Sequence, residues 1–153
     1  MVREGRVTGA FTGEGARHYG GRWNSQGVAV VYTSEHQSLA ALETLVHLQP
    51  RGSLRFAVIA VEFAEDLIEQ FPATALPSHW RVQPPGAATM EIGNAWVRTA
   101  RTPVLAVPSV VVPEEWNFLL NPLHPEFGRI KVQEPIEFSF DPRLVGEPKV
   151  RHQ

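Results

Sequence analysis

Glycine and proline are frequent in this chain, except over residues 28–49 and 53–71, which contain neither. Its 153 residues include 12 glycines and 13 prolines, which follow no repeating period. Proline removes a backbone donor and glycine weakens the interior of a helix or strand, so long regular elements are disfavoured. We therefore expect short strands and few helices joined by many turns. The lack of a period also excludes collagen-like and low-complexity folds.

The composition is that of an ordinary globular domain. Hydrophobic residues make up 43% of the chain and charged residues 20%, and the length suits one domain with a real core. No apolar run approaches the roughly 18–20 residues of a membrane span, and no basic-then-apolar signal segment opens the chain. We expect one domain over residues 1–153, with a flexible tail at 145–153, in a soluble cytoplasmic protein.

Charge and cysteine content exclude several kinds of site. The chain has no cysteine, which rules out disulfides, thiolate zinc sites and a cysteine nucleophile. Its 14 basic and 16 acidic residues give a net charge of −2, so it lacks the basic footprint of a nucleic-acid-binding protein. Neither nucleic acid nor a membrane is expected as a direct partner.

Hydrophobic patterning predicts a mixed α+β fold. Strands are predicted over residues 28–33, 54–63, 104–107, 109–112, 130–132 and 136–140. Helices are predicted over 34–48, which opens with the capping-box pair Ser34 and Gln37, and over 87–101, with a short helical piece at 64–70. The glycine-rich residues 8–27 are predicted as one long loop. Strands outnumber helices and their connections are mixed, which indicates the α+β class.

Glu43 is the most informative residue of the helix predicted over 34–48. It lies at the margin of the helix's apolar stripe, where a carboxylate is poorly hydrated and needs a partner or a task. A solvated Glu43 paired with His47, four residues later, is the plainer interpretation. The same two residues, with His36 near their face, have the spacing of metal ligands. Without a clear third ligand or a His-Glu-x-x-His motif, a metal site is weakly supported.

The glycine-rich segment 8–27 surrounds two arginines, Arg17 and Arg22. Glycines let backbone N–H groups approach an anion closely, and a guanidinium can bind phosphate oxygens through two hydrogen bonds. The glycine spacing fits neither the Walker A loop nor the dinucleotide fingerprint. An anion-binding loop and an ordinary surface loop both remain open on these grounds.

Two further residues occupy positions that suit a site. Tyr32 ends the strand that precedes the helix of Glu43, so both side chains can face one cleft. Its ring could belong to the core or stack on a flat cationic ring. Ser109 has apolar neighbours, so its hydroxyl is expected to turn inward and to need a partner. No Gly-x-Ser-x-Gly elbow supports a serine hydrolase.

A set of short motifs stands in a fixed order along the chain. They are Gly21-Arg22-Trp23-Asn24, Gly27, Val30-Val31-Tyr32-Thr33, Ala41-Leu42-Glu43, Leu45-Val46-His47-Leu48, Val107-Pro108-Ser109, Pro113, Asn117, Asn121-Pro122, His124-Pro125 and Phe140-Asp141-Pro142-Arg143-Leu144. This ordered set resembles the RES domain, a family named for its Arg, Glu and Ser. The resemblance extends over residues 11–144, nearly the whole chain.

One departure from the family pattern concerns the first residues. Members usually carry an aromatic-Arg pair in an opening strand, about twenty residues before the Gly-Arg-Trp motif. Here Met1-Val2-Arg3 stands where that pair should just have passed. Either Arg3 takes the place of the family's arginine or the chain lacks it, and in the second case full activity would be in doubt.

The resemblance implies both a fold and a function. RES proteins have a split β-sheet core with flanking helices, similar to ADP-ribosyltransferases. They are toxins of bacterial toxin–antitoxin pairs and consume NAD⁺ by hydrolysis, phosphorolysis or transfer of ADP-ribose to a protein. NAD⁺ is then the substrate, with no prosthetic group and no metal. The implied partners are a helix-turn-helix antitoxin of the Xre type and a second copy of the chain in a homodimer.

The resemblance also assigns roles to residues. Glu43 would stabilise the positive charge that develops on the ribose when the nicotinamide bond breaks, as carboxylates do in glycosidases. Arg22 would hold the pyrophosphate, Tyr32 would stack on the nicotinamide ring, and Ser109 would bond the nicotinamide-side ribose. Three more residues are candidates for substrate binding, with turn stabilisation as their alternative role: Asn117, Asn121 and His124.

Three rival functions stay open at this point. Transfer of ADP-ribose to a protein differs from hydrolysis or phosphorolysis only in which acceptor reaches the sugar carbon. A non-catalytic module would bind NAD⁺ or a partner without releasing nicotinamide. A metal-dependent hydrolase would need a bound divalent ion.

Overall fold

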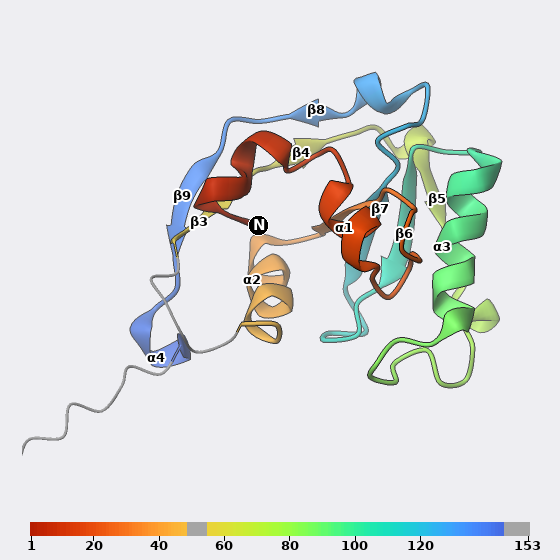
Figure 1. Ribbon diagram of the computed structural model, residues 1–153, viewed down its shortest axis with the longest axis horizontal. Coiled ribbons are helices and arrows are strands. Elements are labelled where there is room, and N and C mark those ends of the chain that lie inside the picture. The colour runs from red at the N-terminus through yellow and green to blue at the C-terminus, as the bar shows by residue number, and fades with distance from the viewer. Residues whose placement is uncertain (49–54, 146–153) are drawn as a thin grey trace, which may run out of the picture.

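The computed structural model describes residues 1–48 and 55–145, which form two β-sheets, a two-stranded ribbon and several short helices (Figure 1). The strands are β1 (Val2–Arg3), β2 (Val31–Ser34), β3 (Arg55–Val58), β4 (Val61–Glu62), β5 (Ile68–Gln70), β6 (Val104–Pro108), β7 (Trp116–Leu120), β8 (Lys131–Val132) and β9 (Ile136–Ser139). The α-helices are α1 (Glu14–Tyr19), α2 (Gln37–Leu45), α3 (Ala87–Thr99) and α4 (Pro142–Val145). Four 3₁₀ turns complete the fold: η1 (Glu4–Gly9), η2 (Glu65–Leu67), η3 (Ala73–Ala75) and η4 (Phe127–Arg129). The α+β class predicted from the sequence is confirmed.

The β-structure is split into two sheets. One has four strands in the order β2-β7-β6-β5, and the other has three in the order β1-β3-β9. In the larger sheet β5 is parallel to β6, and the other pairings are antiparallel. The small ribbon of β4 and β8 continues the pairing of β3 with β9 towards the larger sheet (Figure 1). Both the split core and the flanking helices were predicted through the family resemblance.

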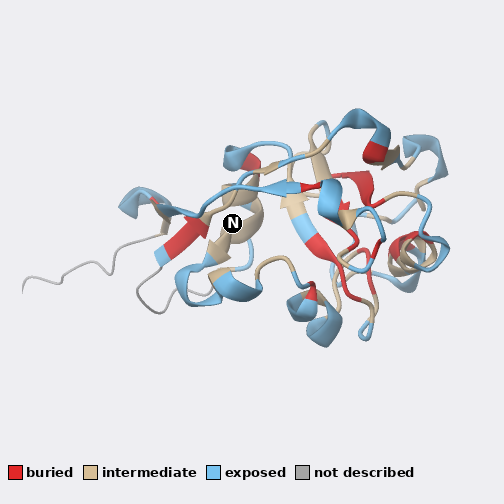
Figure 2. Ribbon diagram, turned by 90° about the horizontal axis from the view of Figure 1, so that it is seen from above, coloured by how far each residue is buried: buried red, intermediate tan, exposed pale blue. Residues whose placement is uncertain are grey.

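The core lies on both faces of the larger sheet. Every residue of β6 is buried, as expected for a central strand covered on both sides. One face packs with α3 through Trp23, Val30, Trp96, Leu105, Val107 and Leu119. The other packs with the chain around the ribbon through Val31, Leu67, Val104, Leu120 and Ile130. Figure 2 shows many of the buried residues along these strands and much of the exposed chain at the periphery.

Helix α3 fixes the turn that carries Arg22. A Cβ at Gly93 would lie 1.7 Å from the carbonyl oxygen of Trp23, so only glycine permits this close approach. The neighbouring Asn94 accepts a hydrogen bond from the N–H of Ser25 at 3.0 Å and donates one to its hydroxyl at 2.8 Å. Gly93 lowers helix propensity, and close packing of the helix on this turn explains its presence.

The prediction of one long loop at residues 8–27 is wrong. Residues Glu14–Tyr19 form helix α1, and η1 extends to Gly9. The fully buried side chain of Asn24 organises the rest of the segment. Its amide nitrogen donates to the carbonyls of Ala16, Ser25 and Val28 at 2.9, 3.2 and 3.0 Å. The segment is thus ordered by one internal polar side chain rather than by hydrophobic periodicity. The predicted strand at 28–33 starts only at Val31.

The predicted capping box of α2 is also wrong. The helix begins at Gln37 after His36, and no side chain caps its first turn. The Ser34 hydroxyl donates instead to the side-chain oxygen of Asn117 on β7 at 2.8 Å. Ser34 therefore lies two residues before the N-cap residue His36, and its hydroxyl contacts β7. The helix ends at Leu45, short of the predicted 48.

Three other predictions are corrected by sheet pairing. Residues 109–112, predicted as a strand, belong to the turn between β6 and β7, and residues 116–120, for which no strand was predicted, form β7 itself. Residues 68–70, predicted as helical, form β5 because they pair with β6. The predicted strand over 54–63 is divided into β3 and β4, with residue 54 outside the described part. In each case pairing between distant segments overrides local preference.

The remaining predictions differ little from the structure. Of the predicted tail at 145–153, Val145 still belongs to α4, and 146–153 lie outside the described residues. The predicted helix at 87–101 and the strands at 104–107, 130–132 and 136–140 correspond to α3, β6, β8 and β9 within a residue or two. Within residues 1–48 and 55–145, no helix is long and apolar enough to cross a lipid bilayer.

Candidate functional site

A cavity of about 670 Å³ brings together most of the residues proposed for the site. That volume lies within the range of small-molecule sites, about 300–1,000 Å³. Four predicted residues line it: Arg22, Tyr32, Glu43 and Asn117. They come from the turn before β2, from β2 itself, from α2 and from β7. The expectation that Tyr32 and Glu43 face one cleft is confirmed.

Two side chains hold the carboxylate of Glu43 by one of its oxygens. The Ser109 hydroxyl donates to Oε1 at 2.8 Å, and the amide nitrogen of Asn117 donates to the same Oε1 at 2.6 Å. The second oxygen, Oε2, accepts no hydrogen bond from residues 1–48 or 55–145. The carboxylate of this cavity-lining residue is thus fixed in direction, and one of its oxygens has no hydrogen-bond partner among the described residues.

The two donors are themselves fixed. The Ser109 hydroxyl is fully buried and accepts the N–H groups of Val111 and Val112, both at 3.0 Å. Its single proton is therefore committed to Glu43. The side-chain oxygen of Asn117 accepts from Ser34, which sets the orientation of the amide. Ser109 was predicted to turn inward and to need a partner, and that prediction is confirmed.

Tyr32 presents its ring to the cavity and buries its hydroxyl. The residue is 39% exposed, yet its hydroxyl donates to Oδ1 of Asn24 at 2.7 Å and accepts the N–H of Trp23 at 3.0 Å. Burial of the hydroxyl raises the pKa of Tyr32, so the ring stays neutral. A Cβ at Gly21 would lie 2.6 Å from this hydroxyl, which explains why glycine precedes Arg22.

Arg22 carries a polar atom that no described residue satisfies. Its Nη1 donates to the carbonyls of Trp80 and Val82 at 2.5 and 3.1 Å. Its Nη2 is buried and has no hydrogen-bond partner among residues 1–48 and 55–145. Burial lowers the pKa of Arg22, and the nearby charge of Glu43 opposes that shift. A buried unsatisfied donor is costly, so its presence beside a cavity points to an anionic ligand.

Arg3 was left open by the sequence and lies at the same cavity. Strand β1 pairs with β3, with Arg3 opposite Phe56, and this pairing places Met1, Val2 and Arg3 in the cavity wall. The cavity therefore has a second arginine besides Arg22. The distance between Arg3 and the Gly-Arg-Trp motif was the only sequence signal for it.

Asn121 and His124 lie outside the cavity wall. Both are buried in the turn after β7. Asn121 accepts the N–H of Leu123 through its side chain at 3.1 Å, and the two ring nitrogens of His124 contact the carbonyl of Ala100 and the N–H of Glu126, both at 3.0 Å. These contacts fit the alternative role, stabilisation of the turn.

The hydrogen-bond partners of Glu43 differ from the predicted His47. His47 lines the cavity, but the hydrogen bonds to Glu43 come from Ser109 and Asn117. Within the described ranges, no three His, Asp or Glu side chains gather in a way that could hold a metal ion. Glu43 and His47 therefore have no third ligand there.

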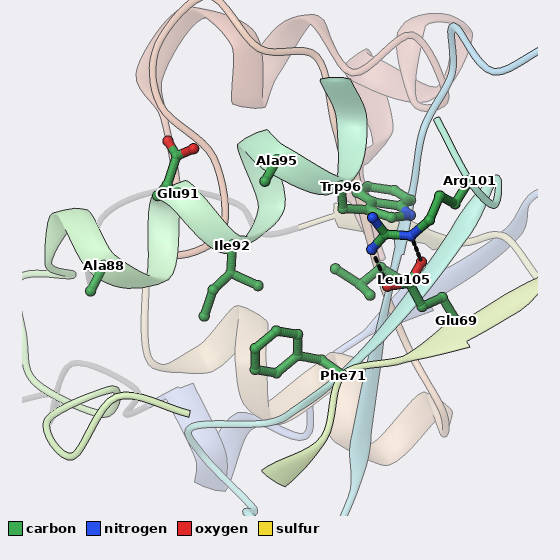
Figure 3. A pocket seen from close by; sticks show the side chains of 9 residues that line it. All are labelled: Glu69, Phe71, Ala88, Glu91, Ile92, Ala95, Trp96, Arg101 and Leu105. Carbon is green, nitrogen blue, oxygen red and sulfur yellow. Dashed lines mark hydrogen bonds and ion pairs between the residues drawn. The ribbon is translucent and has the colours of Figure 1, made fainter. Parts of the chain in front are cut away.

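A second cavity, of about 320 Å³, lies between α3 and the strands β5 and β6 (Figure 3). Its wall is mostly apolar, with Phe71, Ile92 and Leu105 turned towards it (Figure 3). Its charged groups are already paired: Arg101 binds both oxygens of Glu69, at 3.0 and 2.5 Å. None of the residues predicted for the site lines this cavity.

Comparison with known families and proteins agrees with the sequence resemblance. The family model described as "RES domain" matches residues 2–141. A protein named "Toxin Res" from Yersinia enterocolitica is 41% identical over 146 residues, covering 94% of this chain and 96% of its own length. A protein named "Prs ADP-ribosylating toxin" from a Sphingobium species is 38% identical over 139 residues, covering 88% of this chain and 86% of its own.

A solved structure supports the fold. The chain is similar to a chain in the crystal structure of the Mycobacterium tuberculosis MbcT–MbcA toxin–antitoxin complex, with a TM-score of 0.59 and 19% sequence identity. The match covers 89% of this chain and 80% of the other. At that identity the likeness concerns the fold alone.

Proposed function

The chain belongs to the RES domain family, and we propose that it is the toxin of a toxin–antitoxin pair that cleaves the nicotinamide–ribose bond of NAD⁺. One observation carries the proposal: Arg22, whose buried Nη2 lacks a protein acceptor, and Glu43, whose carboxylate is oriented by two donors, line the same cavity. A substrate with an anionic group and a centre that becomes positive during reaction fits this pair. NAD⁺ combines both features in its pyrophosphate and its nicotinamide ribose.

Arg22 is proposed to bind the pyrophosphate. Its guanidinium geometry suits phosphate oxygens, and Nη2 would gain the acceptor it lacks. Arg3, also in the cavity wall, would add a second positive charge. The exposed ring of Tyr32 offers a flat surface for the cationic nicotinamide, and its buried hydroxyl holds that ring in place.

Glu43 is proposed to act on the ribose. When the bond from the sugar carbon to nicotinamide breaks, the electron pair leaves with nicotinamide and positive charge grows on the sugar. A fixed carboxylate stabilises that charge more than it stabilises the ground state. Ser109 and Asn117 hold Oε1, so that Oε2 can face the sugar. Ser109 then acts by positioning Glu43.

The acceptor completes the reaction. With water as acceptor, its oxygen would bond to the sugar carbon and a proton would pass to solvent; with inorganic phosphate, an anionic phosphate oxygen would bond to the same carbon. Purified protein should be incubated with NAD⁺, with and without phosphate, and the products separated by chromatography. We expect nicotinamide together with ADP-ribose, or with its 1″-phosphate when phosphate is the acceptor. Intact NAD⁺ under both conditions would contradict the proposal and leave a binding module.

Transfer of ADP-ribose to a protein is the second candidate, favoured by the name of the Sphingobium relative, "Prs ADP-ribosylating toxin". The two reactions share the bond that breaks and differ in the acceptor. Incubation with NAD⁺ labelled on the adenine side in a bacterial lysate separates them. Label that becomes covalently bound to one protein supports transfer, and label recovered only as small molecules supports hydrolysis or phosphorolysis.

An antitoxin is the proposed partner. The structural neighbour was solved as a toxin–antitoxin complex, and the family resemblance suggests a helix-turn-helix protein of the Xre type, with a homodimer of this chain. Co-expression with a small helix-turn-helix protein encoded next to it, followed by size-exclusion chromatography with light scattering, tests both. Co-elution with loss of nicotinamide release is expected. Separate elution, with nicotinamide release unchanged, would contradict the antitoxin.

A further inference from the structure

We propose that the segment Trp80–Val82 is the positioning element that directs the Arg22 guanidinium towards the anionic part of the substrate. The inference deepens the proposed function and rests on it. The segment lies between η3 and α3, about sixty residues after Arg22 in sequence. None of the RES motifs quoted above includes it.

The contacts of Arg22 are divided unequally between its two terminal nitrogens. Nη1 donates to both carbonyls of the segment, those of Trp80 and Val82. Nη2 is buried and receives no acceptor from the described residues. Because a guanidinium is planar, with its N–H groups in a fixed fork, holding Nη1 at two points sets the direction of Nη2. The segment thus orients the arginine and leaves one amino group without a protein acceptor.

The segment is anchored next to the residue that it orients. The ring of Trp80 packs against that of Trp23, with ring centroids 6.3 Å apart and planes inclined by 33°. Trp23 directly follows Arg22 and is buried in the core on the α3 side of the sheet. Trp80 belongs to the partly buried residues packed on that core. The carbonyl contacts therefore depend on an aromatic anchor.

The same segment also contacts the turn that contains Ser109, a hydrogen-bond donor to Glu43. The guanidinium of Arg81 donates to the carbonyl of Val110 at 3.2 Å. Val110 follows Ser109, whose hydroxyl holds Glu43. Three consecutive residues thus contact both Arg22 and the turn beside Glu43. The segment would set the separation between the cation and the carboxylate, and it acts through these residues rather than on substrate directly.

The test measures ADP-ribose binding by calorimetry and NAD⁺ kinetics in parallel. Trp80→Ala should weaken ADP-ribose binding about tenfold, the order expected for a misdirected charged hydrogen bond. It should raise KM for NAD⁺ more than it lowers kcat, and Trp80→Phe should restore most of the affinity. In a double-mutant cycle, Trp80→Ala should add little to the loss already caused by Arg22→Ala. Unchanged affinity in Trp80→Ala, or losses that simply add, would overturn the proposal.

Arg22→Lys gives an independent test should Trp80→Ala fail to fold. A lysine ammonium is a point charge without a planar fork, so it cannot keep the carbonyl contacts and also direct a second donor. We expect Arg22→Lys to bind ADP-ribose almost as weakly as Arg22→Ala. Wild-type affinity in Arg22→Lys would contradict a directed guanidinium. Failure of the wild-type chain to release nicotinamide would count instead against the proposed function.

Discussion

The two cavities contain the same kinds of charged side chain in opposite arrangements. In the smaller one, Arg101 and Glu69 satisfy each other through two hydrogen bonds (Figure 3). In the larger one, two backbone carbonyls hold Arg22, and Ser109 and Asn117 hold Glu43. Each of these charged groups keeps one polar atom free of protein partners within the described chain.

This difference in hydrogen-bond partners distinguishes a structural ion pair, Arg101 with Glu69, from charged groups oriented for a ligand, Arg22 and Glu43. Opposite charges that are free to meet form an ion pair, as Arg101 and Glu69 do at the surface. Keeping Arg22 and Glu43 on other partners, and leaving a buried donor unsatisfied, costs stability. Such local costs concentrate where a protein binds or reacts. We therefore expect substrate binding and reaction in the larger cavity.

Removal of the carboxylate from the larger cavity should have the largest effect. Glu43→Ala should lower the rate of nicotinamide release about 10²–10³-fold, as is typical when one contact made chiefly in the transition state is lost. Glu43→Asp is the matched variant, because it keeps the charge but withdraws it from Ser109 and Asn117.

Steady-state kinetics and circular dichroism on both variants provide the measurement. Folded Glu43→Ala with a wild-type rate would remove Glu43 from the mechanism. An active Glu43→Asp would show that charge matters more than the fixed direction of the carboxylate.

Loss of the Ser109 hydroxyl should have an intermediate effect. In Ser109→Ala, Glu43 loses one of its two donors, and the N–H groups of Val111 and Val112 lose their acceptor. We expect kcat to fall about tenfold and the free energy of unfolding to fall by about 1–3 kcal/mol. Chemical denaturation and initial rates measure the two effects. A loss of stability with no change in kcat would restrict Ser109 to the fold.

Part of this site could be predicted from the sequence because its signals are local. The strand-to-helix order placed Tyr32 and Glu43 at one cleft, and the apolar neighbours of Ser109 implied a buried hydroxyl with a partner. The partner itself, Glu43, comes 66 residues earlier. Neither spacing nor periodicity specifies a contact of that range, and the family resemblance alone linked these residues to one site.

The remaining differences share a physical cause. Ser34 matched a capping box, but the helix begins at Gln37 with His36 as its N-cap, and the Ser34 hydroxyl donates to Asn117 on β7. Residues 68–70 and 116–120 became strands through pairing with β6. The carbonyl partners of Arg22 belong to backbone, which leaves no trace in residue type. Local patterns thus failed where distant segments supply the hydrogen bonds.

Tyr32→Phe should change stability more than turnover. Without the hydroxyl, the N–H of Trp23 and the Oδ1 of Asn24 each lose a partner. The free energy of unfolding should fall by about 1–3 kcal/mol, while the ring surface remains and nicotinamide release drops less than about tenfold. Tyr19→Phe is the control, since Tyr19 is 69% exposed. Equal melting temperatures for the two variants would show that the buried hydroxyl contributes nothing.

The smallest effect is expected in the smaller cavity. Glu69→Ala breaks the contact with Arg101, and both side chains remain solvated at the surface. Nicotinamide release and KM for NAD⁺ should stay at their wild-type values, because neither residue lines the larger cavity. A loss of turnover comparable to that of Ser109→Ala would mean that the two cavities are coupled, and the comparison between them would fail.

The central claim is that Glu43 acts on the reacting sugar and not on the affinity of the site. The most direct measurement compares wild type with Glu43→Gln in nicotinamide release from NAD⁺ and in calorimetric binding of ADP-ribose. We expect Glu43→Gln to bind ADP-ribose within a few-fold of wild type and to release almost no nicotinamide. Release at the wild-type rate by Glu43→Gln, or none by wild type itself, would contradict it.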